Sequence, residues 1–206
     1  MLVRDIMQGR VITATPSTGI SEATRRLRTR GIRHLLIVEN DALVGIVSDR
    51  DVKQALQPGQ SAMADIMTRA VITIESTAPV EDAARVMLTE KISALPVTEA
   101  GHLVGIVTET DVVRLFVKAL GAGEPSSRID VVVGQTSNAL ADLVATVQGV
   151  GAPVSSIVTL PGGDGLKEAV LRVGTIDPRP AIAALIAKGY AVKTAWRNGE
   201  RTGRVA

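Results

Sequence analysis

Hydrophobic and polar positions follow two spacings along the first sixty residues, one typical of helices and one typical of strands. Apolar residues recur at helical spacing between residues 20 and 27, and Gly31 predicts the end of that helix. Apolar runs at 35–38 and 43–47 predict two strands, and the polar residues between them indicate a hairpin. A short β-rich run at 11–13 precedes the helix. With a further helix opening after the second strand, the predicted order is β-α-β-β-α.

The same pattern recurs sixty residues later without a gap. Residues 3–53 and 63–113 share 19 identities in 51 pairs, and both begin with Asp-Ile-Met, at 5–7 and 65–67. A long repeat that occurs only twice predicts two units that bury their apolar faces on each other about a pseudo-twofold axis. Ligand clefts are then expected in pairs.

A different pattern follows the second repeat. Residues 121–127 have the Gly, Pro and Ser content of a linker, and 128–197 predict a second fold. We expect strands at 129–133, 154–160, 169–176 and 190–196, and helices at 138–148 and 180–188. This βαββαβ order predicts a ferredoxin-like sandwich, α+β in class, with both helices on one face of an antiparallel sheet. Residues 198–206 are expected to form a flexible tail.

Composition narrows the classes of function. The chain is 46% hydrophobic but holds one Trp, one Tyr and one Phe, so its core is aliphatic. A net charge of +2 gives no basis for nucleic-acid binding, which needs clustered Lys and Arg. The absence of Cys excludes disulfides and thiolate chemistry. No apolar run approaches the ~20 residues that span a membrane, and without an apolar leader the expected location is cytoplasmic.

Two motifs carry a resemblance to a known family. Asp-Ile-Met opens each repeat, and Gly-Ile-Val-Ser/Thr-x-x-Asp closes it, at 45–51 and 105–111. With the Leu-Pro-Val strand at 95–97, residues 1–120 resemble tandem CBS domains, together a Bateman module, with motif 1 over 1–60 and motif 2 over 61–120. The resemblance implies two paired β-α-β-β-α units with up to two clefts for adenosine-containing ligands such as AMP, ADP, ATP or S-adenosylmethionine.

Each closing motif ends a strand and opens a helix, where unpaired backbone N–H groups attract an anion. Ser or Thr followed three residues later by an acid is also a capping box that only satisfies the helix start, and this alternative stays open. By resemblance, Ser48 or Thr108 would face a phosphate, while the carboxylate of Asp51 or Asp111 would accept hydrogen bonds from ribose hydroxyls.

Other candidates differ between the repeats. Arg50 carries a guanidinium suited to phosphate, whereas its counterpart is Thr110, so a charge-dependent preference should differ between the clefts. Arg33 and His34 precede the first inner strand, where related modules place basic side chains near a ligand phosphate. The alternative is a half-exposed histidine at a strand entrance.

No aromatic residue precedes Phe116, so adenine is expected to lie between aliphatic side chains and backbone amides. The resemblance implies residues 13–15 and 73–75 as base-contacting segments, where Glu75 brings a carboxylate near the phosphate of the second cleft. Mg²⁺ is expected only through a nucleotide's phosphates, near Asp49 and Asp51. The candidate binding residues are Thr13, Thr15, Arg33, His34, Ser48, Arg50, Asp51, Thr73, Thr108, Thr110 and Asp111.

The order and size of residues 128–197 resemble an ACT domain, a module that commonly binds amino acids at dimer interfaces. That family's Asp-x-Pro-Gly is replaced here by Gln135-Thr136-Ser137-Asn138, and Ser137 is explained as a helix cap. Tandem CBS domains followed by an ACT-like domain resemble the AcuB-type proteins, named for acetoin utilisation. The resemblance implies a homodimer.

The leading hypothesis is a non-catalytic cytoplasmic sensor, in which an adenosine ligand shifts the assembly or the contacts with a protein partner. A ligand-independent homodimeric scaffold and an amino-acid sensor acting through the ACT-like domain remain alternatives. An enzyme is not expected, since the sequence has no Ser-His-Asp arrangement and no metal-ligand spacing. A nucleotide hydrolase ranks last.

Overall fold

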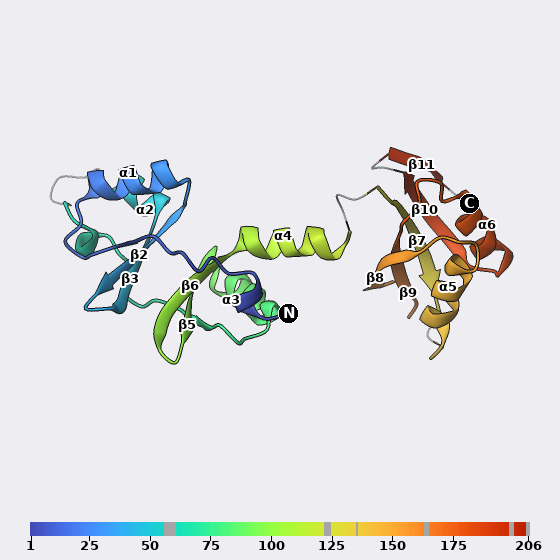
Figure 1. The fold of residues 1–206 in the computed structure, drawn as a ribbon, viewed down its shortest axis with the longest axis horizontal. Coiled ribbons are helices and arrows are strands. Elements are labelled where there is room, and N and C mark those ends of the chain that lie inside the picture. The colour runs from blue at the N-terminus through green and yellow to red at the C-terminus, as the bar shows by residue number, and fades with distance from the viewer. Residues whose placement is uncertain (56–60, 122–124, 135, 163–164, 198–199, 205–206) are drawn as a thin grey trace. The chain divides into compact units, whose positions relative to one another are not determined.

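The computed structural model of the chain describes residues 1–55, 61–121, 125–134, 136–162, 165–197 and 200–204, with side chains up to residue 193. The chain forms two compact units, Met1–Arg114 and Leu115–Ala206. Figure 1 shows the first unit as two small sheets with helices beside them and the second as one larger sheet.

The first repeat has the predicted β-α-β-β-α order, preceded by a 3-10 turn that ends at the Asp of Asp-Ile-Met. The first helix ends at Gly31, whose φ of 61° is the left-handed conformation that glycine adopts readily. Asn40 and Asp41 both have positive φ, as a two-residue hairpin turn requires. The elements are η1 (Val3–Asp5), β1 (Thr13–Ala14), α1 (Ile20–Arg30), β2 (His34–Glu39), β3 (Ala42–Ser48) and α2 (Asp49–Gln54).

The second repeat has the same elements. Its hairpin turn again has two positive φ values, at Ala100 and Gly101, but its first helix ends at Lys91, which takes the left-handed conformation with φ 56°. The elements are η2 (Met63–Asp65), β4 (Ile74–Glu75), α3 (Val80–Glu90), β5 (Ala94–Glu99), β6 (His102–Thr108) and α4 (Glu109–Ala119).

Each repeat builds a three-stranded sheet, β1-β2-β3 or β4-β5-β6, in which the short first strand is parallel to the second and the last two form the hairpin. The opening segments are exchanged between the two cores. Val3 is buried in the core of the second repeat, and Met63 is buried in the core of the first. The boundary between residues 60 and 61 therefore separates the sequence repeats but not the packed cores.

The second unit is one five-stranded sheet of order β11-β10-β7-β9-β8 with all neighbours antiparallel. Alternate residues of β7 and β9 join residues of both helices in one aliphatic core, as Ile129, Leu171, Leu143 and Leu185 show. The elements are β7 (Ser127–Val133), α5 (Ala139–Gln148), β8 (Val154–Pro161), β9 (Lys167–Val173), α6 (Arg179–Ala187), β10 (Ala191–Arg197) and β11 (Glu200–Arg204).

Three sequence predictions for this unit were wrong in detail. The tail predicted at 198–206 includes a strand, β11, which pairs with β10 because that strand otherwise offers an open edge to the chain that follows it. Within the linker predicted at 121–127, of which 122–124 lie outside the described residues, Ser126 and Ser127 are buried and Ser127 already begins β7. Ser137 does not cap α5: the cap position is Asn138, and its side chain makes no capping hydrogen bond.

Candidate functional site

The segment that follows each Asp-Ile-Met crosses to the other repeat. The backbone N–H of Gln8 donates to the carbonyl of Ile106 at 2.8 Å, and the Ile106 N–H donates back at 3.1 Å. Thr68 exchanges the equivalent pair of hydrogen bonds with Ile46, at 3.0 and 3.1 Å. Each strand that leads into a closing motif is thus flanked by a segment of the other repeat.

A close contact between methionine and glycine fixes this crossing. A Cβ atom on Gly45 would lie 2.6 Å from Sδ of Met67, and one on Gly105 would lie 2.6 Å from Sδ of Met7. Real Cβ atoms do not approach other atoms so closely, so a larger residue at either position would force the methionine to shift. The two motifs of each repeat therefore have a packing role, in which the Met of one repeat rests on the Gly of the other.

Two clefts result, and thirteen positions of their linings correspond at an offset of sixty. We name them the Asp51 cleft and the Asp111 cleft, after the acidic residue of each closing motif. Arg33, His34 and Asp49 line the Asp51 cleft without a counterpart in the other, as Arg114 does in the Asp111 cleft. Both combine a strand end and helix start from one repeat with the crossing segment and the strand entrance of the other. Their volumes are about 260 Å³ for the Asp51 cleft and about 440 Å³ for the Asp111 cleft.

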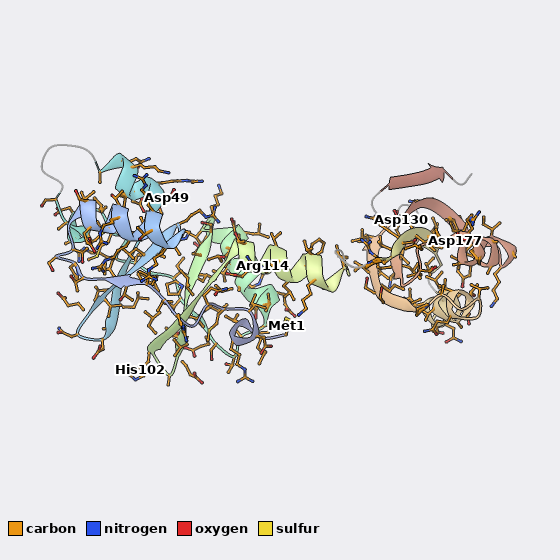
Figure 2. All side chains as sticks on the ribbon, turned by 45° about the horizontal axis from the view of Figure 1, so that its top comes forward. Met1, Asp49, His102, Arg114, Asp130 and Asp177 are labelled. Atoms are coloured by element: carbon orange, nitrogen blue, oxygen red, sulfur yellow. The ribbon has the colours of Figure 1, made fainter. Side chains whose placement is uncertain are left out.

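The Asp51 cleft has a polar side and an apolar side. Its apolar side is aliphatic, with Ile46, Ile72 and Pro96 among its residues. The cations on its polar side are Arg33, Arg50 and Lys91, and none of these has an ion pair within the described part of the chain. The carboxylates are those of Asp49 and Asp51. Figure 2 labels Asp49 at the start of α2.

The capping box predicted at each closing motif is present. In the first repeat, the Asp51 carboxylate accepts from the N–H and the hydroxyl of Ser48, both at 2.7 Å, and the Asp51 N–H donates to Ser48 Oγ at 3.3 Å. In the second, Asp111 accepts from the N–H of Thr108 at 3.0 Å and from its hydroxyl at 2.6 Å. In each box both bonds to the carboxylate end on the same oxygen, Oδ2.

The other oxygen, Oδ1, differs between the clefts. Oδ1 of Asp111 accepts from Nε2 of Gln8 at 3.2 Å and from Nη1 of Arg114 at 3.0 Å. Thr110 is also engaged, since its hydroxyl accepts from Nη2 of Arg33 at 3.3 Å. Oδ1 of Asp51 accepts no hydrogen bond from the described residues.

His34 lines both clefts, at the entrance of β2. Its Nε2 lies 3.2 Å from the hydroxyl of Ser93, at the entrance of β5. Burial, and secondly the neighbouring Arg33 guanidinium, hold the pKa of His34 below its ordinary value, with Asp49 and Asp51 acting in the opposite direction. An anion in either cleft favours the protonated ring, so ligand charge and the protonation of His34 are coupled.

The structure brings eight of the eleven candidate residues into the clefts. The Asp51 cleft holds Arg33, His34, Ser48, Arg50 and Asp51, and the Asp111 cleft holds Arg33, His34, Thr108, Thr110 and Asp111.

Thr13, Thr15 and Thr73 line neither cleft, and neither does Glu75. Thr13 already belongs to β1, where it pairs with Leu36 of β2. At this position the chain has left the other repeat and lies on the sheet of its own repeat. Glu75 instead accepts a hydrogen bond from the hydroxyl of Thr98 at 2.9 Å.

The segments that do reach the clefts lie a few residues earlier, at 8–12 and 68–72. Neither these segments nor Lys91 was among the residues predicted from the sequence. The sequences of the two segments carry little signal. Residues 8–10 all differ from 68–70, but the nine pairs between 14–22 and 74–82 also all differ.

Within the described residues, no group of three or more His, Asp or Glu side chains is placed to hold a metal ion. Nor does any described helix have the length and apolar character needed to cross a membrane. His102, labelled in Figure 2, begins β6 directly after the hairpin turn and lines neither cleft.

A comparison with protein families decides the family. The CBS domain matches residues 3–58 and again residues 63–118, which together make up more than half of the chain. The chain belongs to the CBS domain family. Its two CBS domains are the two sequence repeats, and the clefts are those of a CBS pair.

Solved structures of CBS pairs resemble the first unit. The CBS domain pair of protein MJ0100, in complex with 5′-methylthioadenosine and S-adenosyl-L-methionine, is 40% identical with a TM-score of 0.54, covering 56% of this chain and 95% of that one. CBSX2 in complex with AMP is 31% identical with a TM-score of 0.52, covering 57% and 96%. A putative acetoin utilization protein (AcuB) from Vibrio cholerae is 29% identical with a TM-score of 0.54, covering 59% and 93%.

Curated relatives named as enzymes match over the same CBS region, at 41% identity over 117 residues in one case. The chain spans only 21–24% of the length of those relatives. The similarity therefore concerns their CBS pairs, which are regulatory modules, and leaves out most of each enzyme.

Proposed function

We propose that this protein is a non-catalytic regulatory sensor, which binds an adenosine-containing ligand in its CBS pair and signals by a change in assembly or in partner contacts. The ligand class is AMP, ADP, ATP or S-adenosylmethionine. Binding shifts the population of conformations only as far as the ligand prefers one of them.

The observation that carries the proposal is the polar side of the Asp51 cleft. The unengaged Oδ1 of Asp51 is an acceptor that suits the two hydroxyls of a ribose. Arg50 and Lys91, both without ion pairs in the described chain, suit a phosphate. A ligand whose ribose carries a diol, an anionic 5′ group and a flat base matches this arrangement.

The apolar side of the cleft suits the base. Ile46, Ile72 and Pro96 supply aliphatic surface, and the crossing segment 68–72 supplies backbone groups. The cleft has no aromatic residue among those described, so adenine would be held by aliphatic contacts and backbone hydrogen bonds rather than by stacking. Mg²⁺ would enter only with a nucleotide's phosphates.

The similar structures give independent support for the ligand class. The MJ0100 pair was solved with 5′-methylthioadenosine and S-adenosyl-L-methionine, and CBSX2 with AMP. These ligands share adenosine and differ in what the 5′ position carries. We therefore propose adenosine as the shared part of the ligand. The cations of the cleft are expected to make the affinity of each ligand depend on its 5′ group.

For the second unit we propose a ferredoxin-like, ACT-type module that supports self-association. The order β10-β7-β9-β8 within its sheet, with the helices α5 and α6 packed into the same core, supports this assignment. In a homodimer, a ligand-induced change of conformation in one CBS pair could alter its contacts with the other subunit. Sedimentation of the full chain with and without ligand tests the link between binding and assembly.

Thermal unfolding of nucleotide-stripped protein tests the ligand class. AMP, ADP, ATP and S-adenosylmethionine are compared with GTP, each with and without Mg²⁺. A ligand at ~100 times its dissociation constant adds ~2.7 kcal/mol, a shift of several degrees for a unit of this size. We expect the shift with adenosine compounds only.

The matched variants are Asp51→Ala and Asp65→Ala. Both remove a carboxylate that caps a turn, since Asp65 accepts from the N–H groups of Ser61 and Ala62 at 2.9 and 3.0 Å, but Asp65 is exposed and lies outside both clefts. Both variants are expected to melt slightly earlier, and only Asp51→Ala should lose the ligand shift. A chain that gains no stability from any adenosine compound at millimolar concentration would contradict the proposal and leave the ligand-independent scaffold.

A further inference from the structure

The two clefts differ in how much of their carboxylate is available. A carboxylate has about four acceptor sites. At Asp111 four donors occupy it: the N–H and hydroxyl of Thr108 on Oδ2, and the side chains of Gln8 and Arg114 on Oδ1. At Asp51 the two donors of Ser48 share Oδ2, and Oδ1 is left for a ligand.

Space does not explain the difference. The Asp111 cleft, at about 440 Å³, is larger than the Asp51 cleft, at about 260 Å³. A ligand that fits the Asp51 cleft therefore has room in the Asp111 cleft. What the Asp111 cleft lacks is an unengaged acceptor for the ribose.

Replacing the Arg114 donor at Asp111 with a ribose hydroxyl brings no net gain in binding free energy. The Asp111 side chain is 6% exposed, and Arg114 brings a full positive charge to it. A ribose hydroxyl in that cleft would replace a charge-assisted bond from Arg114 with a neutral one, which is weaker. In the Asp51 cleft the same hydroxyl adds a bond without displacing any.

We propose that the adenosine ligand occupies the Asp51 cleft alone, and that Gln8 and Arg114 are the specificity residues that exclude it from the Asp111 cleft. This inference rests on the proposed function. It specifies which of the two related clefts binds the ligand and which side chains determine that choice.

The internal repeat supplies the substitutions that test it. Thr68 is the counterpart of Gln8, and Gln54 is the counterpart of Arg114. Neither Thr68 nor Gln54 donates a side-chain hydrogen bond to Asp51 within the described residues. The variant Gln8→Thr/Arg114→Gln therefore gives the Asp111 carboxylate the same neighbours at these two positions as Asp51 has. Both replaced side chains are largely exposed, so the fold should tolerate the exchange.

Equilibrium dialysis of the full chain with radiolabelled AMP and, separately, S-adenosylmethionine measures the number of sites. We expect one site per chain in the natural sequence, with a 10- to 100-fold loss of affinity in Asp51→Ala. Gln8→Thr/Arg114→Gln should bind two ligands per chain. Adding Asp111→Asn to that variant should return it to one.

The outcomes separate this inference from the proposed function. Two sites in the natural chain, a site that persists unchanged in Asp51→Ala, or one site only in Gln8→Thr/Arg114→Gln would overturn the inference while adenosine binding stands. No binding to any of these chains, with unfolding transitions showing that each is folded, would overturn both.

Discussion

The crossing of the two repeats can be tested at the contact between Gly45 and Met67, because Gly45→Ala adds a single methyl group there. A Cβ atom on Gly45 would lie 2.6 Å from Sδ, 3.0 Å from Cγ and 3.2 Å from Cβ of Met67. Met67 is 8% exposed and belongs to the core of the first repeat. Sδ would have to move away, and because Cγ and Cβ also lie in tight contact, rotation of the end of the side chain would not relieve the whole contact.

The size of the effect follows from this packing. Overfilling a well-packed core costs about 1–3 kcal/mol, so Gly45→Ala should lower the free energy of unfolding by that amount. Met67→Ala alone should cost about 2–5 kcal/mol through lost burial and an empty volume. In Gly45→Ala/Met67→Ala the new methyl occupies part of that volume, so the loss should fall short of the sum of the two single losses by about 1 kcal/mol or more.

Urea unfolding followed by circular dichroism measures the three free energies. Gly9→Ala is the matched control, since the nearest atom to its added Cβ is the Val104 carbonyl oxygen at 3.9 Å, an ordinary contact. It should change stability by less than about 0.5 kcal/mol. The packing argument is refuted if Gly45→Ala is no less stable than Gly9→Ala, or if the losses of the Gly45 and Met67 variants simply add.

Two further predictions concern residues of the Asp51 cleft. Because the pKa of His34 is lowered in the folded state, the unfolded chain binds the proton more readily, and stability should fall as the pH drops from about 7 through the ordinary histidine pKa of 6.5 toward the lowered one. His34→Asn should lessen that fall between pH 7.5 and 5.5 in urea titrations, and an unchanged pH dependence would contradict the assignment. Lys91 holds a left-handed φ of 56°, where its counterpart is Gly31, so Lys91→Gly should raise the free energy of unfolding by about 0.5–1 kcal/mol. The same change should weaken the binding of ATP but not of uncharged 5′-methylthioadenosine in calorimetric titrations, and equal losses for both would argue against a phosphate contact.

The repeat made most of the first unit predictable. Helix ends at Gly31, hairpin turns at 40–41 and 100–101, and the two capping boxes all arise from residues close in sequence, so local pattern was sufficient. The crossing between repeats was not predictable in this way. A segment that follows Asp-Ile-Met can lie on the strand of its own repeat or of the other, and two similar repeats offer nearly the same apolar surface for both.

That ambiguity explains why Thr13, Thr15 and Thr73, which were predicted from the sequence, do not line the clefts. Their position in the repeat was identified, but the segments that face the clefts are the ones that cross, a few residues earlier. The engagement of Asp111 was hidden for a similar reason, because Gln8 lies 103 residues away from it in sequence. The strand at 200–204 is a different case, since Asn198-Gly199 before it is a pair typical of hairpins, and the sequence analysis did not use it.

A crystal structure of the full chain grown with saturating AMP would locate the ligand itself. We predict ribose hydroxyls on Oδ1 of Asp51, the phosphate near Arg50 and the base against residues 68–72, with Gln8 and Arg114 still on Asp111. A ligand bound against Thr13 and Thr15, or in neither cleft, would contradict the proposed sensor site. A ligand in both clefts would contradict the exclusion by Gln8 and Arg114.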